Sequence, residues 1–138
     1  MRSRLDRART RGCDGVEPDN VDGYANTTGF PLTAADQLDF DRFLATEGHA
    51  RGLSVGLKND LDQLAELEPA FDWALDEECL KYAECDLLAP VIAAGKAVFH
   101  VEYGDAALAA TVCRETHALR FDTLIKDLAL DSFRIACR

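Results

Sequence analysis

The chain has 138 residues, of which 48% are hydrophobic and 29% are charged, and its formal net charge at pH 7 is −10. This length predicts one domain, and the composition is that of an ordinary globular protein. The negative charge disfavours nucleic-acid partners, because two polyanions repel each other. No apolar run reaches the roughly 18 residues of a membrane span. The first residues lack the apolar region of a signal peptide, so none is expected in this chain.

The first third of the chain predicts a helix, a strand, a loop and a second helix. Residues 1–11 favour the end of a helix, with Gly12 as its C-terminal stop. The strand covers residues 13–20, which form an apolar run that ends in carboxylates. After a loop over 21–32, Thr33 is the expected N-cap of the next helix, with Asp36 completing a capping box, and Gly52 ends that helix.

The remaining two thirds predict four more strands, each followed by a helical segment. The strands are expected at 53–57, 71–75, 97–101 and 121–125. Helices are expected to open at Asp60, Asp86 and Asp105, and a last short helical segment covers 128–135. Two side chains within these strands, those of His100 and Trp73, are expected to pack in the core.

Strict alternation of helix and strand predicts crossover units and a parallel sheet. No glycine-rich nucleotide-binding motif follows any strand, which disfavours a dinucleotide-binding fold. Charge at the C-terminal end of every strand is instead typical of a (β/α) TIM barrel, whose chemistry lies at those ends. A full barrel has eight strands and about 250 residues. The sequence therefore predicts a single, incomplete barrel domain over residues 1–138, equivalent to strands four to eight.

Eleven polar side chains are expected along the rim formed by the strand ends. They are Glu17, Asp19, Lys58, Asp60, Asp76, Glu77, Glu78, Glu102, Tyr103, Lys126 and Asp127. Carboxylates that share a cavity shift one another's pKa and can divide into an acid and a base. Glycoside hydrolysis needs such a pair, and nearby lysines could keep one carboxylate ionised.

Two other interpretations of the rim stay open. An acid just after a strand often serves only as a helix N-cap, which is the expectation for Asp60 and Asp105. Alternatively, the carboxylates could hold Mg²⁺ for phosphoryl transfer. The net negative charge argues against that alternative, because it repels phosphorylated substrates.

Five cysteines permit two interpretations. One is two disulfides with a buried thiol at Cys13, which would imply an oxidising compartment; the other is five reduced, buried cysteines. Their spacing matches no zinc motif, and the three histidines are scattered.

Several segments together resemble a known family. These are Gly12-Cys13-Asp14-Gly15-Val16-Glu17-Pro18-Asp19-Asn20-Val21-Asp22, Gly29-Phe30-Pro31-Leu32-Thr33, Gly56-Leu57-Lys58-Asn59-Asp60, Phe71-Asp72-Trp73-Ala74-Leu75-Asp76-Glu77-Glu78-Cys79 and Val101-Glu102-Tyr103. Over nearly the whole chain, the sequence resembles glycoside hydrolase family 114. That family has a TIM-barrel domain and includes endo-α-1,4-polygalactosaminidases, and related fungal sequences are described as α-galactosidase-like.

The resemblance implies a role for each matching residue. Asp19 corresponds to the nucleophile and Glu77 to the acid/base, while Cys79 and Cys85 correspond to a loop disulfide. The matching positions expected to line the substrate site are Lys58, Asp60, Glu102 and Tyr103. Their place on the rim adds Glu17, Asp76 and Lys126 as expected substrate contacts. The family usually has Asn at the position of Asp76, so this chain carries an additional charge beside Glu77.

The resemblance further implies an extracellular, retaining enzyme that acts on α-1,4-linked galactosamine polymers without metal or cofactor. A cationic amino sugar suits an acidic cleft. Because three strands of the barrel are expected to be absent, two further outcomes are considered. In one of them the chain is an inactive remnant, and in the other it is a sugar-binding piece. Exposed sheet edges could also drive self-association.

Overall fold

A computed structural model describes residues 1–137 of the chain. They divide into two compact units, Met1–Trp73 and Ala74–Arg138. No helix among the described residues is both long enough and apolar enough to cross a membrane. The single domain expected from length stays a prediction.

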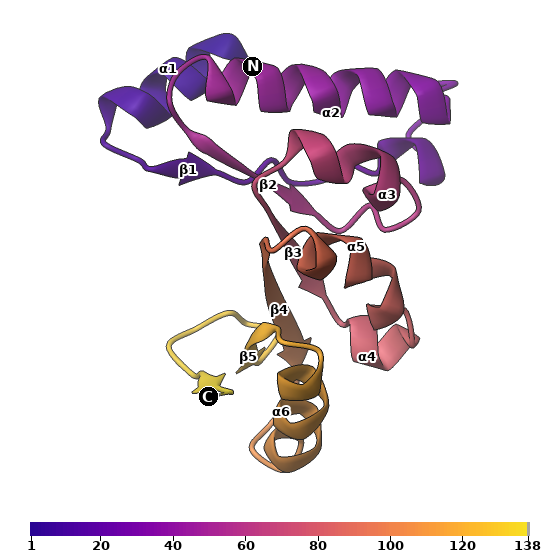
Figure 1. Ribbon diagram of the computed structural model, residues 1–138, viewed down its shortest axis with the longest axis vertical. Helices are drawn as coiled ribbons and strands as arrows, with labels where there is room; N and C mark the ends of the chain where they lie inside the picture. Colours follow the sequence, from indigo (N-terminus) through magenta and orange to yellow (C-terminus); the bar gives the residue numbers. More distant parts are fainter. Residues whose placement is uncertain (138) are drawn as a thin grey trace. The chain divides into compact units, whose positions relative to one another are not determined.

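The first unit contains two parallel strands covered by helices (Figure 1). Its elements are α1 (Arg2–Thr10), β1 (Gly15–Val16), η1 (Gly23–Ala25), α2 (Ala34–His49), β2 (Ser54–Lys58), α3 (Leu64–Leu67) and η2 (Glu68–Ala70). Gly15 lies opposite Ser54 in the parallel ladder. Helix α2 packs against both α1 and β2, and the core between them includes Leu44, Leu53 and Val55, each at most 2% exposed.

Helix α2 begins where the sequence predicts. The Thr33 side chain accepts a hydrogen bond from the Asp36 backbone N–H at 3.2 Å, and the Asp36 carboxylate accepts one from the Thr33 N–H at 2.9 Å. This capping box satisfies two backbone donors that would otherwise lack partners. The capping box therefore starts α2, the helix that packs against β2, at the predicted residue.

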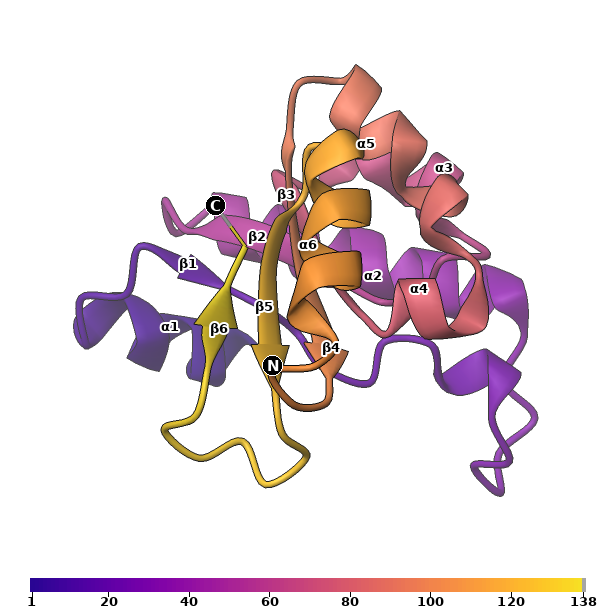
Figure 2. The ribbon, with the colours of Figure 1, turned by 90° about the horizontal axis from the view of Figure 1, so that it is seen from below.

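Parallel and antiparallel pairing both occur in the second unit. Its elements are β3 (Trp73–Glu77), which begins at the last residue of the first unit, α4 (Cys79–Tyr82), η3 (Cys85–Leu88), α5 (Ala89–Ala93), β4 (Ala97–Tyr103), α6 (Ala109–Ala118), β5 (Asp122–Lys126) and β6 (Ile135–Ala136). Strands β4 and β5 are parallel, from Phe99 opposite Asp122 to Tyr103 opposite Lys126. Strand β6 runs antiparallel beside β5, and α6 packs on β5 (Figure 2).

The four longer strands extend one or two residues beyond the predicted ends. They finish at Lys58, Glu77, Tyr103 and Lys126. An apolar run reports which side chains are buried, whereas a strand ends where its backbone hydrogen bonds end. The prediction therefore stopped at the last apolar residue, and the polar rim residues belong to the strands themselves.

The first strand and the last segment differ from expectation. Strand β1 has only two residues and is half-buried, because Pro18 offers no backbone donor and Asn20 has a positive φ of 58°. The segment predicted as a final helix instead leads into β6, with Leu128 79% exposed. There Leu130 has a φ of 52°, which interrupts a right-handed helix.

The predicted aspartate caps are also wrong. Helix α3 has Gln63 as its N-cap residue, not Asp60. Helix α6 follows Leu108, whereas the Asp105 carboxylate accepts a hydrogen bond from the Ala107 N–H at 2.8 Å within the preceding turn. Both aspartates lie in tight turns between strand and helix, where aspartate stabilises the turn itself.

Two disulfides are present, Cys79–Cys85 and Cys113–Cys137. The first is the pair that the family resemblance implies. The second ties α6 to the end of the chain beyond β6. Cys13 is free but exposed, not buried as predicted, because it lies in the turn between α1 and β1, where its N–H bonds the Ala8 carbonyl at 3.1 Å.

Candidate active site

Four of the predicted rim residues occupy the last position of a strand. Lys58 ends β2, Glu77 ends β3, Tyr103 ends β4 and Lys126 ends β5. Catalytic residues in barrels come from these C-terminal ends.

In the first unit, Asp19 forms an ion pair with Lys58. The Lys58 Nζ lies 3.0 Å from Asp19 Oδ1, and the same oxygen accepts a hydrogen bond from the Asn20 N–H. The contact with Lys58 is the main cause that lowers the pKa of Asp19. Because the Asp19 side chain is 59% exposed while Lys58 is only 15% exposed, Asp19 is an ionised carboxylate accessible to a substrate.

A cavity of about 400 Å³ adjoins Asp19. The loop after β1 contributes Glu17, Pro18, Asp19 and Asn20, and the other lining residues are Met1, Arg4, Leu5, Val16 and Leu44. Glu17 thus lines the same cavity as Asp19 and is exposed. Of the sequence-predicted site residues, the structure brings Glu17, Asp19 and Lys58 together.

Asp60 occupies a different environment, since it is only 5% exposed. Burial raises its pKa to about 6, with a further contribution from the charge of Asp22, while a hydrogen bond with Tyr24 opposes the shift. One Asp60 oxygen has no hydrogen-bond partner among the described residues. The predicted contact of Asp60 with substrate stays a prediction.

Asp41 on α2 is a buried carboxyl that sequence reasoning missed. It is fully buried and accepts a hydrogen bond from Gln37 Nε2 at 3.0 Å. Burial is the main cause that raises its pKa to about 7. Its position in a helix gives no signal, because the functional acids of a parallel barrel are expected at the strand ends.

We expect Asp41→Asn to stabilise the protein at neutral pH. The folded state binds the Asp41 proton more tightly than the unfolded chain, so the free energy of unfolding should fall as pH rises from about 4 to about 7. Asparagine keeps the acceptor for Gln37 without a charge, and the expected gain at pH 7.5 is on the order of 1–3 kcal/mol. Urea unfolding at pH 4.5 and pH 7.5 measures this.

The matched control is Asp39→Asn, an exposed aspartate on the same helix. It should leave the pH dependence of unfolding as in the wild type. If Asp41→Asn and the wild type lose the same free energy between the two pH values, the assignment of a protonated Asp41 is wrong.

In the second unit, Glu77 and Tyr103 form a hydrogen-bonded pair at the ends of two strands. The Tyr103 hydroxyl donates to Glu77 Oε1. Both side chains are half-buried, so they combine a fixed position with access to solvent. A carboxyl held in this way can exchange a proton with a bound substrate.

Asp76 and Glu102 lie in the interior. Adjacent residues of a strand point to opposite faces, so Asp76 and Glu102 turn away from the faces that carry Glu77 and Tyr103. Asp76 is 1% exposed and Glu102 is 5% exposed. Burial is the main cause that raises the pKa of both carboxyls, that of Asp76 to about 7. Backbone N–H groups of residues 79–81 are partners of both carboxyls, and Glu102 also contacts the His100 ring.

Lys126 binds its own chain. Its Nζ donates to the carbonyl oxygen of Phe133 at 2.6 Å and to that of Asp131. Both carbonyls belong to the loop that connects β5 with β6. The Lys126 ammonium group therefore binds this loop through its described contacts.

The core prediction for two strand residues is largely confirmed. His100 is 1% exposed. Trp73 is half-buried at the start of β3 and stacks over Gly56, where an added Cβ would lie 2.2 Å from the indole ring. Only glycine leaves room for the indole there.

Among residues 1–137, one cluster contains side chains of the kinds that bind metals. The ligand atoms of Cys79, Cys85 and His100 all lie within 4.8 Å of one another. Since the two sulfur atoms are joined in a disulfide, they offer no thiolates to a metal.

A family model described as glycoside-hydrolase family GH114 matches residues 1–138. The chain belongs to this family. Membership confirms the resemblance seen in the sequence.

Solved structures of two other proteins agree with the fold. Aspergillus fumigatus Ega3, in complex with galactosamine, superimposes with a TM-score of 0.92 at 40% identity, over 99% of this chain and 59% of that chain. The glycoside hydrolase domain of PelA from Pseudomonas aeruginosa gives a TM-score of 0.69 at 14% identity, over 99% of this chain and 62% of that chain. A variant of the same PelA domain gives the same values. No curated protein matches the chain.

The agreement with Ega3 confirms the predicted fold class. The chain is a mixed α/β protein with parallel strands that corresponds to part of a TIM-barrel-type domain. It spans less than two thirds of the Ega3 chain. Which strands of a full barrel correspond to β1–β5 stays a prediction.

Proposed function

We propose that this GH114 chain contributes the two catalytic carboxylates of a glycosidase that cleaves α-1,4-linked galactosamine polymers. Asp19 attacks the anomeric carbon, and Glu77 protonates the departing glycosidic oxygen. Glu77 then removes a proton from the water that releases the sugar from Asp19, so the anomeric configuration is retained. The Asp19–Lys58 ion pair carries this proposal, because a nucleophilic carboxylate must be ionised.

The choice of an amino sugar rests on charge and on similarity. The chain has a net charge of −10, which attracts a polycation. Ega3, 40% identical, was solved with galactosamine. Galactosamine carries an ammonium group that its N-acetylated form lacks, so we infer that the enzyme prefers the deacetylated polymer.

We also propose that the protein acts outside the cell. The two disulfides suit an oxidising compartment, and a polymer substrate is too large to enter a cell freely. Self-association through an incomplete sheet stays a prediction.

The proposal is tested by incubating the protein with α-1,4-linked galactosamine polymer and with the same polymer after N-acetylation. We expect new reducing ends from the deacetylated polymer, at least 10-fold faster than from the acetylated one, and the same rate with EDTA. Loss of activity with EDTA would favour the metal-dependent alternative. Binding of the polymer without new reducing ends would instead identify a sugar-binding protein and overturn the catalytic proposal.

A further inference from the structure

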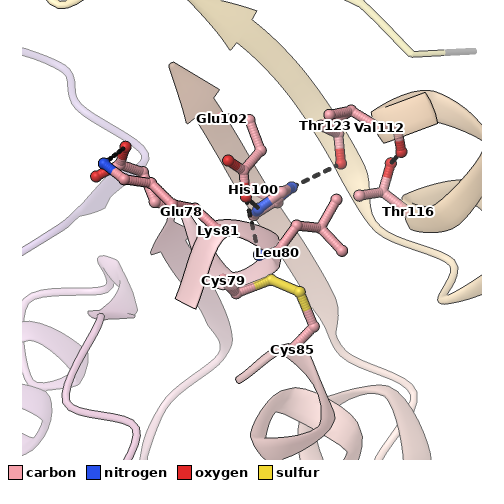
Figure 3. Close-up of polar contacts among 10 residues, drawn as sticks. All are labelled: Glu78, Cys79, Leu80, Lys81, Cys85, His100, Glu102, Val112, Thr116 and Thr123. Atoms are coloured by element: carbon pink, nitrogen blue, oxygen red, sulfur yellow. Dashed lines mark hydrogen bonds and ion pairs between the residues drawn. A yellow bond between two sulfur atoms is a disulfide. The ribbon is translucent and has the colours of Figure 1, made fainter. Parts of the chain in front are cut away.

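A row of buried polar side chains runs from β5 through β4 to α4 (Figure 3). The Thr123 hydroxyl lies 3.1 Å from His100 Nδ1, and His100 Nε2 lies 3.2 Å from Glu102 Oε1. The same Glu102 oxygen accepts a hydrogen bond from the Leu80 backbone N–H at 2.9 Å. Thr123 and His100 are at most 1% exposed, so these two side chains are shielded from solvent.

The hydrogen bonds of this row converge on Glu102. Burial lowers the pKa of His100 to about 4, so its ring is neutral and carries one N–H. A carboxylate oxygen accepts, which places that hydrogen on Nε2 and leaves Nδ1 to accept from the Thr123 hydroxyl. Glu102 Oε1 thus receives donors from both His100 and Leu80, and its orientation depends on both.

The segment that Glu102 holds follows Glu77 directly. Glu78 connects β3 with α4 in the left-handed conformation, at a φ of 67°. Its N–H donates to the Val101 carbonyl at 2.8 Å. Helix α4 begins at Cys79. A shift of Leu80 is therefore transmitted to Glu77 through only two intervening residues.

We propose that Glu102, oriented by His100 and Thr123, is a positioning residue for Glu77 rather than a contact for the substrate. This inference rests on the proposed role of Glu77 as acid/base. Glu102 is only 5% exposed, and its Oε1 is already bonded to His100 and to the Leu80 N–H. By holding the Leu80 N–H, it fixes the turn at the end of β3 and so keeps the Glu77 carboxyl in reach of the Tyr103 hydroxyl.

Thr123→Val tests this proposal, because it removes the hydroxyl furthest from Glu77 at nearly constant volume. Hydrogen exchange at the Leu80 amide and the ¹³C shift of the Glu77 carboxyl are measured by NMR. We expect at least 10-fold faster exchange at Leu80 and a changed Glu77 shift. In the hydrolysis assay, kcat should fall about 10- to 100-fold with KM within twofold, as for a misplaced catalytic group.

Two matched variants separate positioning from stability. Thr116→Val removes another fully buried hydroxyl, which bonds only the Val112 carbonyl of its own helix at 2.9 Å among the contacts described, and it should leave Leu80 and Glu77 unchanged. Thr123→Ser restores the hydroxyl and should restore exchange and kcat to within twofold of the wild type. His100→Gln breaks the row nearer to Glu102 and replaces Thr123→Val if that variant fails to fold.

The proposal is overturned if breaking the row leaves the Leu80 exchange rate and the Glu77 shift as they are in Thr116→Val. It is also overturned if the wild type hydrolyses the polymer and the variant shifts both NMR signals, yet the variant keeps the wild-type kcat. A wild type without hydrolysis refutes the proposed function, and the two NMR signals then still decide whether the row positions Glu77.

Discussion

Asp19→Asn is expected to lower kcat for hydrolysis of the galactosamine polymer at least about 1000-fold. The amide is nearly isosteric with the carboxylate but is a far weaker nucleophile. The fold should tolerate the change, since the Asp19 side chain is 59% exposed. Reducing-end release, measured alongside the thermal unfolding midpoint, separates loss of chemistry from loss of structure.

The control for Asp19 is Asp14→Asn, another exposed aspartate near β1. It should keep near wild-type turnover. If Asp19→Asn retains more than about a tenth of the wild-type rate, a different group must form the bond to the anomeric carbon.

Glu77→Gln is expected to lower kcat on the polymer by about 100- to 10,000-fold, the contribution of a general acid or base. An aryl α-galactosaminide with a good leaving group needs no acid for its departure. The first step should therefore proceed with this substrate, while the second step, which needs Glu77 as base, stays slow. A burst of phenol release followed by a slow steady state is the expected signature.

Glu78→Gln serves as the control for Glu77, because the neighbouring Glu78 pairs with Lys81 at 2.6 Å. This variant should keep both steps near their wild-type rates. Equal slowing of aryl and polymer substrates in Glu77→Gln, without a burst, would remove Glu77 from the acid role.

How well the rim could be predicted depended on which face of each strand a residue occupies. Lys58 and Tyr103 were identified because the end of a buried strand leads to one rim in any parallel barrel. Asp76 and Glu102 come directly before the last residues of β3 and β4, yet burial assigns them to the interior. Separating the rim residues from the interior residues requires the register of each strand end, and the predicted ends were short by one or two residues.

Three-dimensional packing explains the features that sequence patterns missed. Asp41 is buried by packing around α2, a contact between segments far apart in sequence. The antiparallel strand β6 was mistaken for a helix because Leu128 and Leu130 suggested an apolar face. Both leucines are exposed in a loop, which Lys126 holds through the Phe133 carbonyl.

The most direct test of the account is to locate the covalent sugar on the protein. Glu77→Gln is incubated with the aryl α-galactosaminide, digested with protease and analysed by mass spectrometry. The account predicts one galactosaminyl adduct, on Asp19. An adduct on a different carboxylate, or hydrolysis with inverted anomeric configuration and no adduct, would contradict it.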